Sequence, residues 1–255
     1  MTRPTVSIVT PCYNYANFVG ETIKSCLAQT EDVPNIEIFI VNDASTDNSW
    51  EVIQSWMKKD KRVKGINLEK NGGYSHAKNE AIIQSKGEFI TTIDADDMLT
   101  PHSLKYRLKT FKRNPGLQWV HANAYTFKGN KDYAWCCKEM PRLHIHQGTR
   151  IHAQSVMMRR TVYEEYGLYD EELRSKSDKE MWKRLLFTLK IEPIKIKPCV
   201  AFYRRHENSM IRYRKKFPDY NAEVLRIHNK NVEMRQREGV NKRNTRFIPK
   251  EHRLG

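Results

Sequence analysis

Residues 87–97 read GEFITTIDADD and join a short apolar segment to a group of three carboxylates. Residues 88–93 are mostly β-branched or aromatic, which predicts a buried strand. Asp94 and Asp96 follow its carboxyl end, where open α/β sheets bind their ligands. Side chains spaced i and i+2 in an extended segment point the same way, so we expect Asp94 and Asp96 to face one bound group and Asp97 to face elsewhere. Carboxylate oxygens suit Mg²⁺ or Mn²⁺, so a divalent-metal site is the working hypothesis.

The residues after the acids favour a second, simpler interpretation. Thr100 followed by Pro101 is typical of a helix start, with threonine as the N-cap and proline in the first turn. The acids would then form only a solvated turn ahead of that helix. The rest of the chain decides between the two interpretations.

Strand-then-helix units precede the acids and predict a parallel α/β sheet. We expect strands at residues 5–10, 36–41 and 62–68. We expect one helix at 18–28, a second that begins after an N-cap at Ser45 or Thr46, and a third at 74–84. Because the carboxyl ends of parallel strands meet at one edge of a sheet, the residues that follow these strands should share one crevice. They are Tyr13, Asp43, Asn71 with Gly72 and Gly73, Asp94 and Asp96.

Downstream of the acids the pattern becomes mixed. We expect a helix to about residue 112, a strand at 117–127, an irregular stretch at 128–148, a strand at 153–158 and a short helix at 161–166 ended by Gly167. Ser177 and Glu180 fit a capping box for a helix with an apolar stripe. Asp178 lies in its first turn, where the helix dipole keeps a carboxylate ionised, as a general base requires. The same local pattern also fits a residue that only helps the helix begin.

The composition is ordinary for a globular protein except for its charge. The chain has 255 residues and a formal net charge of +15, a field that attracts nucleoside diphosphates, nucleic acid or anionic lipid. No apolar run approaches the roughly 18 residues of a membrane span, and the first residues lack a signal-peptide core. We therefore expect a cytoplasmic protein, soluble or peripheral at the inner face of a membrane. The basic stretch 235–255 should fray or lie on the surface, where its charge can meet anionic lipid.

Histidines and cysteines offer little support for another metal. The five cysteines form no Cys-x-x-Cys pair, and their odd number argues against a disulfide framework. His144 and His146 would share one face of a strand, but no acidic or cysteine partner lies near them, which disfavours zinc. The carboxylates of residues 94–97 remain the metal candidates.

Four segments within the first 125 residues resemble motifs of the family 2 glycosyltransferases, in that family's order and spacing. They are VSIVTPCYN (6–14), VNDASTD (41–47), NGG with AKN (71–73 and 77–79) and GEFI with DADD (87–90 and 94–97). Four further segments resemble the family's acceptor-side motifs, so the resemblance reaches about residue 211. They are SVMMRR (155–160), GLYDE (167–171), SD with Trp182 and Arg184 (177–178) and YRRH (203–206).

The resemblance implies a GT-A fold, which is a Rossmann-like, mostly parallel α/β sheet flanked by helices. Residues 1–125 would form a nucleotide-sugar-binding subdomain, 126–215 a smaller acceptor-binding and catalytic subdomain, and 216–255 a basic helical extension. The resemblance also implies an inverting enzyme that uses Mn²⁺ or Mg²⁺. Such an enzyme moves a sugar from a nucleotide-sugar, with UDP-sugars favoured, to a glycan, lipid-linked or protein acceptor in glycan or polysaccharide synthesis.

By the same resemblance the donor nucleotide is held at the strand ends, with Asp43 at the edge of the base and Asp94 near the ribose or sugar. The donor-binding set is Pro11, Tyr13, Asp43, Asn71, Lys78, Asp94 and Ala95. Asp96 would ligate the metal, and His206 would close over the diphosphate or the metal. Asp178 would be the catalytic base.

The sequence departs from the family pattern next to this base. Ser177 stands where the family commonly has glutamate, so Asp170, Glu171 and Glu180 stay open as alternative bases. The sequence has no Gln-x-x-Arg-Trp segment and no apolar run for a membrane helix, the marks of processive members. A transferase that adds one sugar per encounter is the better interpretation.

The chemistry supports these roles without the family name. When a nucleoside diphosphate leaves a sugar, negative charge grows on it. A divalent cation can offset that charge, and Arg204, Arg205 or Lys78 can add to the effect. The attacking hydroxyl must lose its proton, which a positioned carboxylate can accept.

Two other functions compete with a glycosyltransferase. A nucleotidyltransferase also pairs acids with a metal but usually has a Gly-rich loop after its first strand, and a nucleic-acid-binding protein would use the +15 charge but should carry a recognition motif.

Overall fold

The computed structural model describes residues 5–129, 135–136, 151–173, 177–207, 246 and 248–253. Most of the irregular stretch 128–148, with His144 and His146, and most of the extension 216–255 lie outside these ranges. Predictions about those residues, including a membrane contact of the basic extension, stay predictions. The same holds for the division of the chain at residues 125 and 215.

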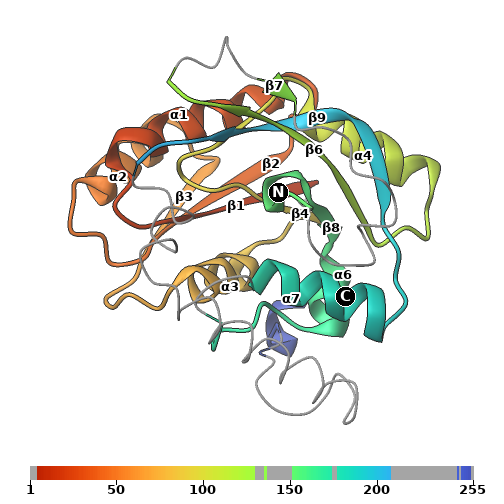
Figure 1. Cartoon of the computed structure of the whole chain (residues 1–255). Coiled ribbons are helices and arrows are strands. Elements are labelled where there is room, and N and C mark those ends of the chain that lie inside the picture. The colour runs from red at the N-terminus through yellow and green to blue at the C-terminus, as the bar shows by residue number, and fades with distance from the viewer. Residues whose placement is uncertain are drawn as a thin grey trace.

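Within the described residues, nine strands form one sheet in the order β3-β2-β1-β4-β8-β6-β9-β5, with β7 paired to β6 (Figure 1). The first four strands of this order run parallel to one another. They are β3 (Val63–Asn67), β2 (Ile36–Asn42), β1 (Val6–Cys12) and β4 (Phe89–Thr92). Every residue of β1 and β2 is buried, as expected for parallel strands that are covered on both faces.

The other half of the sheet mixes directions, because β8 is antiparallel to both β4 and β6, whereas β9 is parallel to β6 and antiparallel to β5. These strands are β8 (Met157–Arg159), β6 (Trp119–Phe127), β9 (Ile194–Arg204), β5 (Met98–Leu99) and β7 (Trp135–Cys136). The prediction of an α/β sheet flanked by helices is confirmed, and beyond β4 the sheet is mixed rather than parallel.

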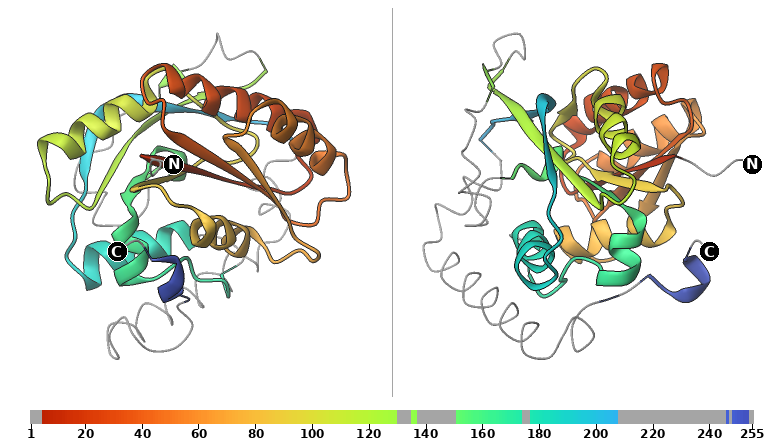
Figure 2. Two further views of the ribbon diagram at one scale, coloured as in Figure 1. Left: turned by 180° about the vertical axis from the view of Figure 1, so that it is seen from behind. Right: turned by 90° about the vertical axis from the view of Figure 1, so that its right-hand side faces the viewer.

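Helices cover both faces of the sheet (Figure 2). The helices α1 (Ala16–Leu27), α2 (Ser49–Lys59) and α4 (Ser103–Arg113) pack into one apolar cluster. The helices α3 (Tyr74–Gln84), α6 (Arg160–Tyr166) and α7 (Ser177–Lys183) pack into a second cluster, and a π-helical turn (Arg184–Thr188) continues α7. Short 3₁₀ turns cover Ala28–Glu31, Ala153–Ser155 and Lys250–His252. No helix in the described ranges combines the length and the apolar character that a bilayer crossing needs.

Two predicted helix starts are wrong, and in both cases the expected cap is used elsewhere. Helix α2 begins at Ser49 because Ser45 and Thr46 bond to Asn14 of the neighbouring loop, with an N–O distance of 2.8 Å from Thr46 N to Asn14 Oδ1. Helix α4 begins at Ser103, and the Thr100 hydroxyl donates to the carbonyl oxygen of Cys199 over 3.0 Å.

Two further predictions need correction on the other side of the sheet. The expected strand 153–158 is a 3₁₀ turn followed by β8, which contains only Met157–Arg159. Ser177 is the first residue of α7 rather than its cap, and its buried hydroxyl has no hydrogen-bond partner among the described residues. The apolar stripe of α7 is confirmed, since Met181, Trp182 and Leu185 are buried.

Of the stretch 235–255 the structure describes residues 246 and 248–253, most of which are exposed, in line with a surface segment, but one side chain anchors the segment to the core. Ile248 is only 1% exposed and packs into the second apolar cluster. The backbone carbonyl of Arg246 accepts a hydrogen bond from Leu168 N, and that of His252 accepts one from Arg160 Nη2. The sequence missed this contact because a single buried isoleucine carries it.

Candidate active site

The loops after β1, β2 and β3 are joined by hydrogen bonds at one edge of the sheet. Asn14, after β1, bonds to Ser45 and Thr46, after β2. Asp43 accepts the backbone N–H groups of Gly72 and Gly73 at 2.7 and 2.9 Å. The predicted convergence is therefore present for these three strand ends.

The predicted nucleoside-binding residues differ in their exposure. Tyr13, which follows β1, is 45% exposed, and Pro11 is buried in β1. Asp43 is also buried, and Asn71 Nδ2 donates to its carbonyl oxygen over 3.0 Å. The loop of residues 71–73 is thus held by both the backbone and the carboxylate of Asp43.

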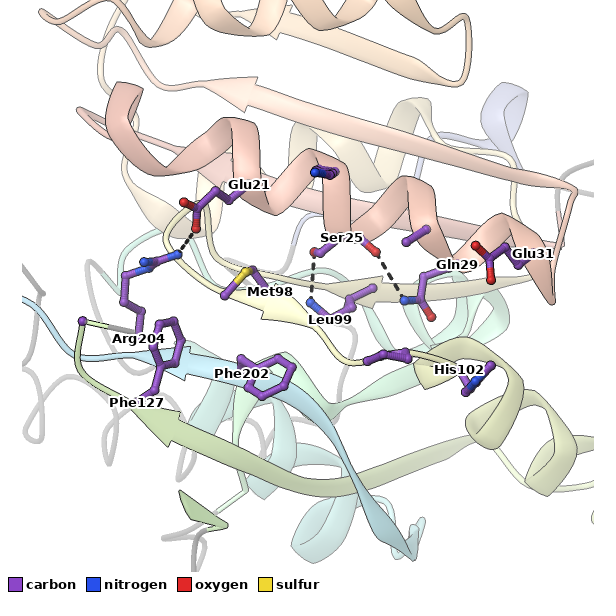
Figure 3. A pocket seen from close by; sticks show the side chains of 14 residues that line it. Glu21, Ser25, Gln29, Glu31, Met98, Leu99, His102, Phe127, Phe202 and Arg204 are labelled. Atoms are coloured by element: carbon purple, nitrogen blue, oxygen red, sulfur yellow. Dashed lines mark hydrogen bonds and ion pairs between the residues drawn. The ribbon is translucent and has the colours of Figure 1, made fainter. Parts of the chain in front are cut away.

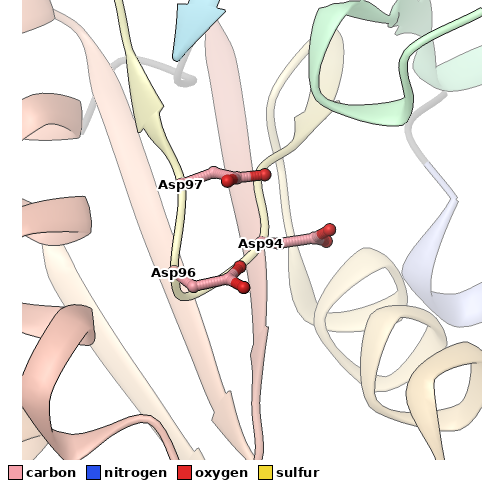
Figure 4. A group of neighbouring side chains, drawn as sticks. All are labelled: Asp94, Asp96 and Asp97. Carbon is pink, nitrogen blue, oxygen red and sulfur yellow. The ribbon is translucent and has the colours of Figure 1, made fainter. Parts of the chain in front are cut away.

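Residues 94–97 form a tight turn, which we call the acidic turn. Strand β4 ends at Thr92, and Asp97 N donates to the carbonyl oxygen of Asp94 over 3.0 Å. One carboxylate oxygen from each of Asp94, Asp96 and Asp97 lies within 4.8 Å of the others (Figure 4). The prediction that Asp97 faces elsewhere is wrong, because the chain turns at residues 95–96 instead of staying extended.

Each carboxylate of the acidic turn has different partners. Asp94 accepts hydrogen bonds from Tyr74 Oη at 2.6 Å and Gln154 Nε2 at 2.8 Å. Burial, and then the charge of Asp96, raises the pKa of Asp94 to about 6. Asp97 Oδ1 accepts the Arg204 N–H over 2.8 Å, whereas Asp97 Oδ2 is buried with no hydrogen-bond partner among the described residues.

The acidic turn has the chemistry of a divalent-metal site. Burial, and then the negative charges of Asp96 and Asp94, hold the pKa of Asp97 well above its usual range. The three acids therefore lie close enough to repel one another when they are ionised. His206 Nε2 lies 2.8 Å from Asp96 Oδ2, which adds a nitrogen donor to the carboxylates. Carboxylate oxygens with one imidazole suit Mn²⁺ or Mg²⁺, and a cation would relieve the repulsion. Ala95 between them is buried, and its carbonyl oxygen accepts the Thr22 hydroxyl.

Lys78 of α3 is a buried ammonium group that interacts electrostatically with Asp94 of the acidic turn. It is 0% exposed, and its Nζ lies 4.3 and 3.8 Å from the ring centroids of Tyr74 and Tyr169. Among the described residues, Nζ has no hydrogen-bond partner. Burial lowers the pKa of Lys78 to about 8, against the opposing charges of Asp178 and Asp94.

Asp178 lies close enough to Tyr74, Lys78 and Asp94 to influence their pKa values electrostatically. Its charge contributes to the raised pKa values of Tyr74 and Asp94, although burial is the larger cause at both residues. The alternative bases are engaged in other contacts. Glu180 is buried and ion-paired with Arg184, and Glu171 contacts Asn79, His76 and Arg246. Asp170 is fully buried, and its Oδ1 accepts Glu172 N.

Three residues at the site were missed as contacts of the acidic turn: Tyr74, Gln154 and Arg204. Tyr74 follows Gly73 directly, so its place after the Gly-Gly turn was an available signal. Gln154 has no such signal, because it follows an irregular stretch of the sequence. Arg204 was considered only as a charge near the diphosphate, and not for its hydrogen bonds to residues 96 and 97.

Solved structures define the class of fold. The chain superposes on residues 1–349 of S. aureus TarS in complex with UDP-GlcNAc with a TM-score of 0.66 and 17% identity, covering 91% of this chain and 68% of that one. It also superposes on the mannosyltransferase PcManGT from Pyrobaculum calidifontis in complex with GDP-Man and Mn²⁺, with a TM-score of 0.66, 17% identity and coverage of 94% and 72%. These likenesses show a GT-A fold.

Sequence comparison identifies the family. Residues 7–167 match glycosyl transferase family 2, and the chain belongs to that family. The glycosyltransferase GlyG of Streptococcus pneumoniae is 40% identical over 100 residues, which are 39% of this chain and 33% of that protein. An uncharacterized glycosyltransferase of Haemophilus influenzae is 33% identical over 164 residues, 63% of this chain and 64% of that protein. The matched regions thus cover between a third and just under two thirds of the length of these relatives. The family match favours a glycosyltransferase over a nucleotidyltransferase or a nucleic-acid-binding protein.

Proposed function

We propose that this chain is an inverting, non-processive glycosyltransferase that moves a sugar from a nucleotide-sugar to an acceptor hydroxyl. The observation that carries the proposal is the acidic turn, where three carboxylates within 4.8 Å of one another lie beside His206 at the carboxyl end of β4. A UDP-sugar is the favoured donor, in line with the UDP-GlcNAc bound by TarS, and PcManGT supports GDP-sugars as the second choice.

In this proposal Asp96 holds the metal, helped by Asp94, Asp97 and His206. When bound, Mn²⁺ or Mg²⁺ acts as a Lewis acid on the diphosphate and offsets the charge of the leaving group. The exposed Tyr13 and the loop of residues 71–73 bind the nucleoside, because they lie at the open edge of the sheet. The remaining donor-site assignments are Pro11, Asp43, Lys78, Asp94 and Ala95.

Asp178 is the proposed base. It takes the proton of the acceptor hydroxyl as that oxygen attacks the anomeric carbon from the side opposite the diphosphate, which inverts the centre. One base suffices for this single displacement. Asp178 is favoured over Glu171 and Glu180 because both of these have ion-pair partners, and Glu180 is buried.

Asp96→Ala tests the metal assignment. Wild-type protein with Mn²⁺ should hydrolyse or transfer from a UDP- or GDP-sugar, and the variant should lose this activity while its circular dichroism and melting temperature stay near wild type. A thermal-shift screen of nucleoside diphosphates with Mn²⁺ identifies the nucleotide, because a ligand that binds only the folded state raises the melting temperature. Full turnover by Asp96→Ala contradicts the assignment.

Asp178→Asn tests the base, with Glu171→Gln as the matched control. The amide keeps the shape of the side chain but cannot accept the proton, so transfer should fall by about 10²- to 10⁴-fold. Donor binding, measured by calorimetry with UDP and Mn²⁺, should stay near wild type. If Glu171→Gln loses transfer and Asp178→Asn keeps it, the base is Glu171.

A further inference from the structure

Arg204 is the last residue of β9, and both its backbone and its side chain contact the acidic turn. Its backbone N–H donates to Asp97 Oδ1 over 2.8 Å, and its Nε donates to the carbonyl oxygen of Asp96 over 2.9 Å. Its Nη2 is ion-paired with Glu21 of α1 (Figure 3). One residue therefore connects β9 and α1 to the two acids that end the turn.

The guanidinium group of Arg204 is fixed in place by aromatic rings. Its central carbon lies 4.9 Å from the ring centroid of Phe18 and 4.8 Å from that of Phe127. Arginine stacks well on aromatic faces and presents its donors in a rigid plane. The side chain therefore loses little conformational entropy when it forms its hydrogen bond. The hydrogen bond to the Asp96 carbonyl oxygen is thus preorganised.

The same packing reaches His206. The Phe18 ring contacts the His206 ring at a centroid distance of 4.8 Å, and it also contacts the Arg204 guanidinium. His206 in turn places Nε2 at 2.8 Å from Asp96 Oδ2. Loss of the Arg204 side chain would therefore loosen both the backbone of the acidic turn and the ring beside it.

We infer that Arg204 is a positioning residue, which holds the acidic turn and His206 in the arrangement that lets Asp96 and its neighbours bind one divalent cation. Three crowded carboxylates repel one another, and a cationic side chain bonded to the turn's backbone opposes their separation. The inference rests on the proposed function, because it requires the cation.

A variant at this position is expected to fold. The Arg204–Glu21 pair lines a cavity of about 650 Å³ that is also bordered by Met98, Leu99 and Phe202 (Figure 3). A shorter side chain at residue 204 enlarges this cavity instead of leaving a sealed void in the core. Arg204→Met keeps most of the aliphatic length of the side chain and removes the guanidinium group that stacks on Phe18 and Phe127.

Arg159 provides a matched control. It also stacks on two phenylalanine rings, at 4.9 Å from Phe89 and 5.5 Å from Phe111, and it is ion-paired with Glu88. Its side chain is 20% exposed, against 12% for Arg204. Its register partner Phe89 begins β4, at the end of that strand opposite the acidic turn.

The experiment measures Mn²⁺ affinity of the full chain by electron paramagnetic resonance of free Mn²⁺, with Mn²⁺ alone as the probe. Outer contacts of metal ligands typically contribute about 10- to 100-fold in affinity, so Arg204→Met should weaken binding by that factor. Arg204→Lys should also weaken it, because a single ammonium does not reproduce the planar fork. Arg159→Met should bind within about twofold of wild type, a margin far below the 10-fold lower bound for outer contacts.

The outcomes separate the inference from the proposed function. If wild type binds Mn²⁺ and Arg204→Met binds it equally well, the inference is overturned and the metal site stands. If Arg159→Met loses as much affinity as Arg204→Met, general destabilisation explains the loss and the inference also fails. If wild type does not bind Mn²⁺, the proposed metal site fails and the inference falls with it.

Discussion

Lys78 has unfavourable surroundings for a charged group. A fully buried charge without a hydrogen-bond acceptor is costly, and among the described residues its Nζ has none. Two features offset that cost. Tyr74 and Tyr169 place their ring faces 4.3 and 3.8 Å from Nζ, and the charges of Asp178 and Asp94 favour the protonated form. A buried charge with a perturbed pKa beside the acidic turn makes Lys78 a candidate functional residue.

Lys78→Met should change how stability depends on pH. The pKa of Lys78 is lowered from 10.5 to about 8 in the folded chain, so between these values the unfolded chain binds more protons than the folded one. The cost of burying the charge is fully present below pH 8, and it is relieved as the pH rises toward 10.5. The stability of wild type relative to Lys78→Met should therefore rise across this window, by at most about 1.4 kcal/mol per pH unit.

Urea denaturation of both proteins at pH 7, 8, 9 and 10 measures that difference. The comparison cancels the titration of groups that the two proteins share. A difference in unfolding free energy that stays constant from pH 7 to pH 10 would show that the lysine is not perturbed in the folded state.

At the scale of elements, the sequence predicted those whose signals are local. Helix α3 begins at Tyr74 and ends at Gln84, as predicted from an Asn-Gly-Gly turn and an apolar stripe. Gly73 has a positive φ of 87°, a backbone conformation that favours glycine. A Cβ at Gly72 would lie 2.2 Å from the His76 ring, so a larger residue there requires that side chain to shift.

The acidic turn could not be predicted in detail, because contacts between distant segments shape it. Met98 and Leu99 pair with Phe202 and Ala201 of β9. This strand pairing lies just before Thr100, the expected helix cap, and it brings Arg204 to Asp97. Local spacing located the acids correctly at the end of β4 but gave the wrong direction for Asp97, and nothing in the local pattern pointed to Gln154.

At the scale of the whole molecule, the described residues of the segment 246–253 connect the late part of the chain to two helices that precede it in the sequence. These residues contact α6 and α3, which pack into the same apolar cluster as Ile248. Arg246 pairs with Glu80 of α3 and with Glu171, and Glu171 also contacts Asn79 and His76 of α3. The segment therefore supports the helix that carries Tyr74 and Lys78.

Ile248→Ala and Arg246→Ala test which contact holds this segment. Ile248 is 1% exposed, and removal of a buried isoleucine side chain to alanine typically lowers the free energy of unfolding by about 2 to 5 kcal/mol. The Arg246 side chain is 42% exposed, and ion pairs of this kind contribute about 1 kcal/mol or less. Urea denaturation should thus show a much larger loss for Ile248→Ala. Equal losses would mean that the charges, rather than the apolar contact, attach the segment, and no loss in either variant would mean that the segment does not pack there in solution.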